Sequence, residues 1–168
     1  MKSRMRKLTS KWSRRILALV VLVVLSTAIA EPAKDPVSGS GSSSAISEYQ
    51  FAGSATLVIR GVEKPADLLV TLLGLTVSED GVQHVVATHT FTFTDGSGSI
   101  TTSDKEIAEP TDEPGLYTLN ANMKVVEGTG IYEGVSGHLT AHGTIDFRAL
   151  PAAEFELRGS ISHVGEEE

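Results

Sequence analysis

The chain has 168 residues, of which 40% are apolar, 5% are aromatic and none is cysteine. The first 15 residues hold seven basic side chains and no acidic one, whereas the other 153 hold seven basic and 21 acidic side chains. The acidic body excludes nucleic acid and anionic lipid as partners bound through basic patches, and the lack of cysteine excludes disulfides, thiolate zinc sites and cysteine nucleophiles.

The chain opens with a basic stretch and an apolar run that together have the form of an export leader. Residues 16–30 read ILALVVLVVLSTAIA and end in the small-x-small pattern that signal peptidases cleave. We therefore predict a signal peptide over residues 1–30, a secreted or otherwise extracytoplasmic protein, and no stable membrane span once the leader is cut. The alternative is a short uncleaved anchor, although a spanning helix needs about 20 apolar residues.

The segment after the leader, residues 31–47, has few side chains that could be buried. It reads EPAKDPVSGSGSSSAIS, a composition typical of flexible linkers. We predict a linker here, a single ordered domain over residues 48–164, and an acidic tail over residues 165–168.

Alternation of apolar and polar residues dominates the predicted domain and indicates β-strands. In residues 84–94, His89, Phe91 and Phe93 alternate with threonines, which favour a pleated sheet. The same period recurs over residues 51–59, 115–127, 135–147 and 155–161. Residues 66–77 are apolar on both faces, and we expect a strand covered on both sides there, with a short helix as the alternative.

Turn signals separate these strands. Asp80-Gly81 and Asp95-Gly96 are typical of tight hairpins that need positive φ. Residues 104–114 combine acidic residues with two prolines, which cannot pair in the middle of a sheet, so we predict a solvated loop there. The pattern as a whole predicts an all-β fold, a single antiparallel β-barrel of about eight strands, with a β-sandwich as the alternative.

Four glycines around a tyrosine form the most specific motif. Gly128, Gly130, Gly134 and Gly137 surround Tyr132, and this spacing predicts a compact structural turn that folds Tyr132 over the end of the core. A nucleotide-binding loop is excluded because the third glycine is one position late and a strand, not a helix, follows.

This motif lies within a longer stretch, GTGIYEGVSGHLTAHGTIDF, that resembles the glycine signature of the dirigent and allene oxide cyclase barrel superfamily. The upstream THTFTFTDGSGSITT is similar to a strand and hairpin of its uncharacterised secreted bacterial members. The resemblance covers residues 87–147. It implies an eight-stranded barrel with a central cavity, and a homo-oligomer, since plant members are often trimers. The radical coupling guided by dirigent proteins and the epoxide closure of the cyclases do not carry over, because the pocket residues of neither group can be matched here.

His89 is the best candidate for a contact to a ligand or for acid/base work, because it shares a face with two phenylalanines. Tyr117 and Tyr132 are the other catalytic candidates. The predicted ligand cavity is lined by Phe91, Phe93, Leu119 and Met123.

No metal and no cofactor are expected. On a straight strand His138 and His142 are about 13 Å apart, too far for one ion. The acidic segment 104–113 lacks the regular oxygen-ligand spacing of a calcium loop.

These features predict a binding or structural module that holds a small apolar ligand. One alternative is a cyclase or isomerase with its site in the barrel cavity. The other is a cell-surface interaction protein with a filled barrel.

Overall fold

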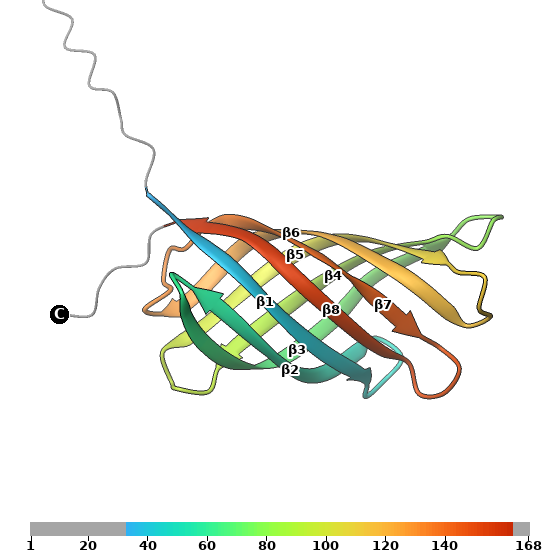
Figure 1. Cartoon of the computed structure of the whole chain (residues 1–168), viewed down its shortest axis with the longest axis horizontal. Coiled ribbons are helices and arrows are strands. Elements are labelled where there is room, and N and C mark those ends of the chain that lie inside the picture. Colours follow the sequence, from blue (N-terminus) through green and yellow to red (C-terminus); the bar gives the residue numbers. More distant parts are fainter. Residues whose placement is uncertain (1–32, 163–168) are drawn as a thin grey trace, which may run out of the picture. The chain divides into compact units, whose positions relative to one another are not determined.

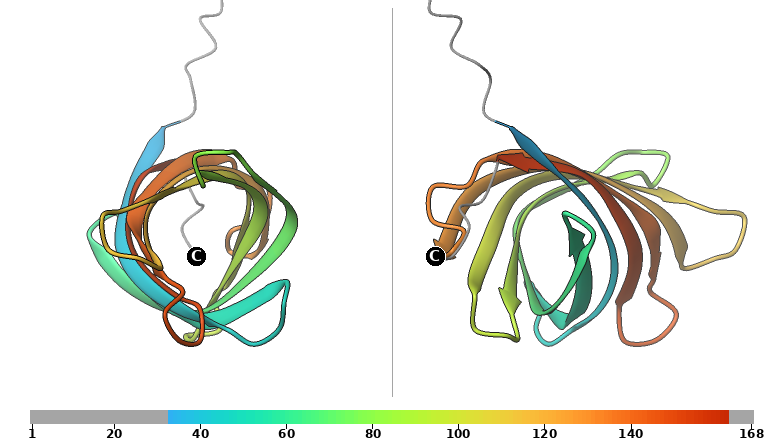
Figure 2. Two further views of the ribbon diagram at one scale, coloured as in Figure 1. Left: turned by 90° about the vertical axis from the view of Figure 1, so that its right-hand side faces the viewer. Right: turned by 60° about the vertical axis from the view of Figure 1, so that its left-hand side comes forward.

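A computed structural model describes residues 33–162, which form a closed antiparallel barrel (Figure 1). Each strand pairs with the next one along the chain, and the first pairs with the last to complete the ring seen end-on in Figure 2. The strands are β1 (Lys34–Ala45), β2 (Gln50–Ile59), β3 (Val62–Val77), β4 (Gln83–Phe93), β5 (Gly98–Pro110), β6 (Leu116–Gly130), β7 (Gly137–Asp146) and β8 (Ala152–Ser162). The predicted barrel of eight strands is confirmed, and the sandwich is excluded.

Some sequence-based expectations fall on residues 1–32 and 163–168, outside the described residues. They are the signal peptide, the first linker residues and the acidic tail. Over residues 33–162 there is no helix with the length and apolar character of a membrane span.

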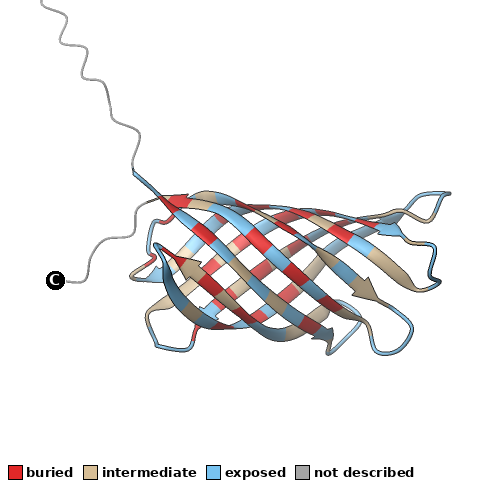
Figure 3. Ribbon diagram, viewed as in Figure 1, coloured by how far each residue is buried: buried red, intermediate tan, exposed pale blue. Residues whose placement is uncertain are grey.

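Burial alternates along the strands, because successive side chains of a strand point to opposite faces (Figure 3). On β4, for example, Val85, Ala87, His89, Phe91 and Phe93 are buried, while most residues between them are partly or fully exposed. The alternation that identifies strands in the sequence therefore also separates the interior of the barrel from its surface.

Strand β1 overturns the prediction of a flexible linker. Residues 34–45 pair with β2 on one side and β8 on the other. Val37 is buried, and a Cβ atom added to the inward-facing Gly41 would lie 2.6 Å from Phe155 Cζ. Small residues are thus needed on β1, where the interior of the barrel is narrow. The segment whose composition is typical of a linker therefore forms the strand that closes the barrel.

Strand β5 overturns the prediction of a solvated acidic loop over residues 104–114. The strand continues to Pro110, and residues 111–115 alone connect it to β6. Asp104 and Glu106 are buried, whereas Lys105 and Ile107 face outward. Charged side chains are rarely buried unless they have partners, so the composition of this segment predicts that it lies in solvent. The alternation of inward and outward side chains along β5 instead directs two carboxylates into the barrel.

Residues 66–77 belong to β3, which bears out the prediction of a strand, but the outer face of this strand is not covered. Leu69 is 41% exposed and Leu73 is 62% exposed. A single closed sheet has no second layer outside it, so apolar residues on this face remain in contact with solvent.

The end of the barrel next to the turn between β6 and β7 is closed by a side chain. Tyr132 is 2% exposed and its ring centroid lies 4.6 Å from that of Phe93. Gly130 has φ of 63°, and a Cβ atom on Gly128 would lie 2.0 Å from the carbonyl oxygen of Tyr132. Both positions therefore require glycine. Gly134 lies in the same turn and Gly137 begins β7.

Candidate functional site

Three ionisable side chains face the interior of the barrel from two adjacent strands. His89 comes from β4, and Asp104 and Glu106 come from β5. They are 8%, 1% and 6% exposed, respectively. Because inward positions recur every second residue, Asp104 and Glu106 are neighbours on the same face of β5. We call these three residues the buried triad.

The triad is held together by contacts of the histidine ring. Asp104 pairs with Ala87, two residues from His89, so the aspartate and the histidine are diagonal neighbours across the two strands. His89 Nδ1 donates a hydrogen bond of 2.7 Å to Asp104 Oδ2 and lies 3.7 Å from Glu106 Oε1. The ring stacks on Phe91 and meets the edge of Phe155, each with centroids 6.2 Å apart. These contacts fix the orientation of the imidazole.

The buried triad carries more acidic than basic groups. Burial raises the pKa of Glu106 above its ordinary value, the neighbouring Asp104 raises it further, and His89 opposes both. Asp104 Oδ1 and Glu106 Oε1 are buried and have no hydrogen-bond partner. Within residues 33–162, the ion pairs that reach these carboxylates all come from His89. One imidazole can offset at most one of the two negative charges, which leaves an uncompensated acceptor in the interior.

A pocket of about 520 Å³ opens at the end of the barrel opposite Tyr132. It is formed by the turns after β1 and β7 and by the adjoining ends of β2, β3, β4, β5 and β7. Its lining is mainly apolar and includes Phe51, Leu72, Leu75, Val85, Ile145, Phe147 and Leu150. This volume and lining are typical of sites for small molecules. We call it the end pocket.

Glu106 connects the end pocket with the buried triad. It is one of the lining residues, and along β5 it lies one inward position nearer this end than Asp104. Apolar side chains surround the mouth of the pocket, where Ile46 is 62% exposed and Leu150 is 64% exposed. A molecule that enters through this mouth would meet the buried carboxylate of Glu106 in a mainly apolar space, whose other polar lining residues are Ser47, Glu48 and Gln83.

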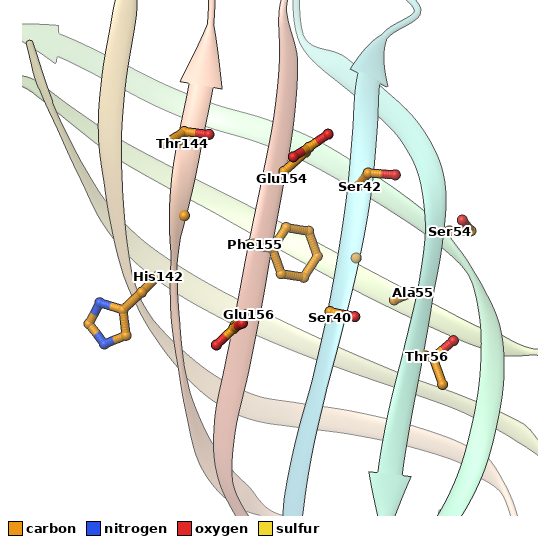
Figure 4. A pocket seen from close by; sticks show the side chains of 12 residues that line it. Ser40, Ser42, Ser54, Ala55, Thr56, His142, Thr144, Glu154, Phe155 and Glu156 are labelled. Atoms are coloured by element: carbon orange, nitrogen blue, oxygen red, sulfur yellow. The ribbon is translucent and has the colours of Figure 1, made fainter. Parts of the chain in front are cut away.

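A second depression, of about 650 Å³, lies over β1, β2, β7 and β8 (Figure 4). Its lining includes Ser40, Ser42, His142, Glu154 and Glu156, all of them exposed. His142 Nδ1 is hydrogen-bonded to Asn120 Oδ1 at 2.7 Å. The polar groups of this depression are solvated and do not converge on a buried point, so it is the weaker candidate.

The structure buries the four residues of the predicted cavity, but it does not place them in the end pocket. Phe91, Phe93, Leu119 and Met123 are at most 5% exposed, and none of them lines the end pocket. Phe91, Phe93 and Met123 belong to the hydrophobic core cluster, whereas the end pocket is built from strand ends and turns.

The tyrosine candidates lie apart from the histidine. Tyr132 closes the opposite end of the barrel, and Tyr117 meets the edge of Phe147 with centroids 5.3 Å apart. Among the described residues, the side-chain partner of His89 is Asp104 rather than a tyrosine. Asp104 and Glu106 are the site residues that the sequence analysis missed. The inward series Ile100, Thr102, Asp104, Glu106 and Ala108 is the signal that could have found them.

No protein-family model matches this chain, and no curated protein sequence matches it. A solved structure of the pterocarpan synthase dirigent protein GePTS1 is similar to it with 15% sequence identity and a TM-score of 0.42, over 79% of this chain and 92% of that one. A similarity of this degree assigns no family to this chain.

Proposed function

We propose that this protein is a binding barrel whose end pocket takes a small, largely apolar molecule with one hydrogen-bond donor. The observation that carries the proposal is a pocket of about 520 Å³ with a mainly apolar lining and the buried carboxylate of Glu106 at its inner limit. This extends the sequence-based hypothesis of a secreted binding module similar to allene oxide cyclases and dirigent proteins. Extracytoplasmic location and assembly into a homo-oligomer remain proposals from the sequence.

The chemistry of the ligand follows from the lining. Apolar surface removed from water stabilises a complex by about 25 cal/mol per Å², and the exposed apolar side chains at the mouth would be covered by the same event. Glu106 Oε1 has no hydrogen-bond partner, and leaving a buried acceptor unpaired costs about 1–3 kcal/mol. A donor on the ligand would satisfy this atom, so a neutral amine, alcohol or phenol on an apolar skeleton fits better than a carboxylate.

The buried triad gives the cyclase or isomerase hypothesis a specific basis. An imidazole oriented by an aspartate, with a second carboxylate that lines the pocket, places acid/base groups beside a mainly apolar space. His89 keeps the role proposed from the sequence, and Glu106 rather than a tyrosine is the group that reaches the pocket. The filled-barrel hypothesis is disfavoured, because the end pocket leaves part of the interior open.

A pair of tryptophan substitutions on β1 tests the binding proposal. Ala45 lines the end pocket, whereas its neighbour Ser44 is exposed. With N-phenyl-1-naphthylamine, a neutral apolar amine that fluoresces when bound, the full-length chain should show saturable binding. We expect Ala45→Trp to weaken binding at least about tenfold, because the indole would occupy the pocket. A tenfold loss of affinity corresponds to about 1.4 kcal/mol of binding free energy.

The control for this test is Ser44→Trp, which should bind the probe as the unmodified chain does. Equal binding by both variants would contradict the proposal. Native mass spectrometry of the protein purified from its host offers a direct readout, since a co-purifying small molecule would be lost from Ala45→Trp and kept by Ser44→Trp.

A further inference from the structure

We propose that the buried triad binds a divalent first-row transition-metal ion through His89 Nδ1 and the carboxylates of Asp104 and Glu106. One donor atom from each of the three residues lies within 4.8 Å of the other two. Donors that each lie about 2.1 Å from one ion are about 3.0–3.5 Å apart. The strand pairing already brings the three side chains together, and rotation of the two carboxylates would have to bring the donors to this separation.

The unsatisfied atoms of the triad supply an independent argument. Asp104 Oδ1 and Glu106 Oε1 are buried without a hydrogen-bond partner, and the Asp104 side chain is 0% exposed. A carboxylate taken out of water costs several kcal/mol unless it is paired or bound to a metal. A divalent cation would offset both negative charges and use both orphan oxygens. Binding would release the proton that now joins His89 Nδ1 to Asp104 Oδ2.

The donor set favours a transition metal over calcium or magnesium. Calcium takes six to eight oxygen ligands, and magnesium requires a nearly ideal octahedron of oxygens. One imidazole nitrogen with two carboxylates suits Zn²⁺, Mn²⁺ or Fe²⁺. Three protein donors leave a coordination position open for water or for a donor atom of another molecule. Because Glu106 lines the end pocket, ions and their exogenous ligands can enter from that end.

The metal site shares Glu106 with the end pocket, so it is tested with the metal alone, in the absence of the proposed apolar ligand. The full-length chain, freed of metal with a chelator, is titrated with Zn²⁺ by calorimetry, and we expect one equivalent to bind with micromolar or tighter affinity. Asp104→Asn and Glu106→Gln remove one charged donor with little change in volume. Each should weaken Zn²⁺ binding at least about tenfold, since even a residue that only supports a metal ligand contributes a factor of 10–100.

Two controls exclude other acidic or histidine groups. Glu109→Gln lies on the same strand but is exposed, and His142→Gln removes the histidine of the outer depression. Both should bind Zn²⁺ as the unmodified chain does. The proposal is overturned if the unmodified chain shows no stoichiometric binding, if both triad variants bind as tightly as it does, or if His142→Gln abolishes binding.

A measurement on the unmodified chain keeps the test decisive if the triad variants do not fold. In ¹⁵N spectra of the histidine rings, one equivalent of Zn²⁺ should move the Nδ1 resonance of the one buried histidine among the described residues, His89. An unchanged His89 resonance at saturating Zn²⁺ would overturn the site.

Discussion

Replacing Gly39 with valine is expected to cost about 3 kcal/mol of unfolding free energy or more and to prevent closure of the barrel. A Cβ atom at this position would lie 2.3 Å from the carbonyl oxygen of Thr56 and 3.1 Å from Leu57 Cα. These contacts are with backbone, so rotation of a side chain cannot relieve them, and one strand must move away from the other. Overpacking in a core typically costs about 1–3 kcal/mol, and more when the backbone is displaced. Here the displaced strand is the one that joins β2 to β8.

Chemical denaturation followed by circular dichroism measures this effect. The matched control is Ser38→Val, which places the same side chain at an exposed position of the same strand and should change the unfolding free energy by less than about 0.5 kcal/mol. If Gly39→Val were as stable as Ser38→Val, β1 would not be a closing strand, and the linker interpretation of residues 31–47 would return.

Replacing Glu106 with glutamine is expected to stabilise the metal-free protein at neutral pH by about 1–3 kcal/mol. The variant removes a buried charge that faces Asp104, also on β5, and His89 on β4, and its amide can donate to the unpartnered Asp104 Oδ1. Leaving such groups unsatisfied costs free energy of this order. Removing one partner of a compensated buried ion pair is strongly destabilising, so a gain in stability is a specific signature of an uncompensated carboxylate.

The pH dependence of this effect has a definite sign. Because the pKa of Glu106 is raised in the folded barrel, the folded state binds a proton more tightly than the unfolded chain. The unfolding free energy of the unmodified protein should therefore fall as pH rises from the ordinary glutamate pKa to the raised one, and this loss should be absent in Glu106→Gln. Urea denaturation in chelator from pH 4 to pH 8 measures both curves. Curves that are parallel, or a variant less stable at neutral pH, would show that the carboxylate is compensated, and Glu109→Gln should match the unmodified protein throughout.

A stabilising Glu106→Gln would bear on function as well as on stability. Functional sites often contain groups that reduce the stability of the protein and that a ligand can reach. Such groups are retained because activity requires them, although they do not favour folding. In this barrel the carboxylate expected to reduce stability, Glu106, is the one that connects the end pocket with His89. A loss of folding stability located at Glu106 would therefore support a functional site at the end pocket.

Sequence alone predicts the architecture because strand alternation is a local property. The threonine ladder opposite His89, Phe91 and Phe93 identifies β4 without reference to any partner strand. Closure of the barrel is a non-local property. Strand β1 is stabilised by backbone pairing with two strands that are distant in sequence, so its Gly/Ser composition could not reveal it.

The candidate site is predictable only in part, because the burial of two of its three residues also depends on strand pairing. His89 stands out because it shares an apolar face, whereas Asp104 and Glu106 lie in a segment whose charge and prolines indicate solvent. Their inward direction follows from the register of β5. The large aromatic residues of β4 are buried, and Phe93 contacts Tyr132 at the end that this tyrosine closes, away from the end pocket. The open end is formed by turns, whose packing no periodic pattern describes.

The binding of an apolar amine at the end pocket is tested most directly by mapping it on the amide spectrum. The isotope-labelled full-length chain is titrated with N-phenyl-1-naphthylamine and followed in ¹H–¹⁵N spectra. The largest shifts should fall on lining residues of the end pocket, such as Phe51, Leu72, Val85 and Glu106. Shifts confined to Ser40, His142 and Glu156 of the outer depression, or none at saturating probe, would contradict the assignment of the site.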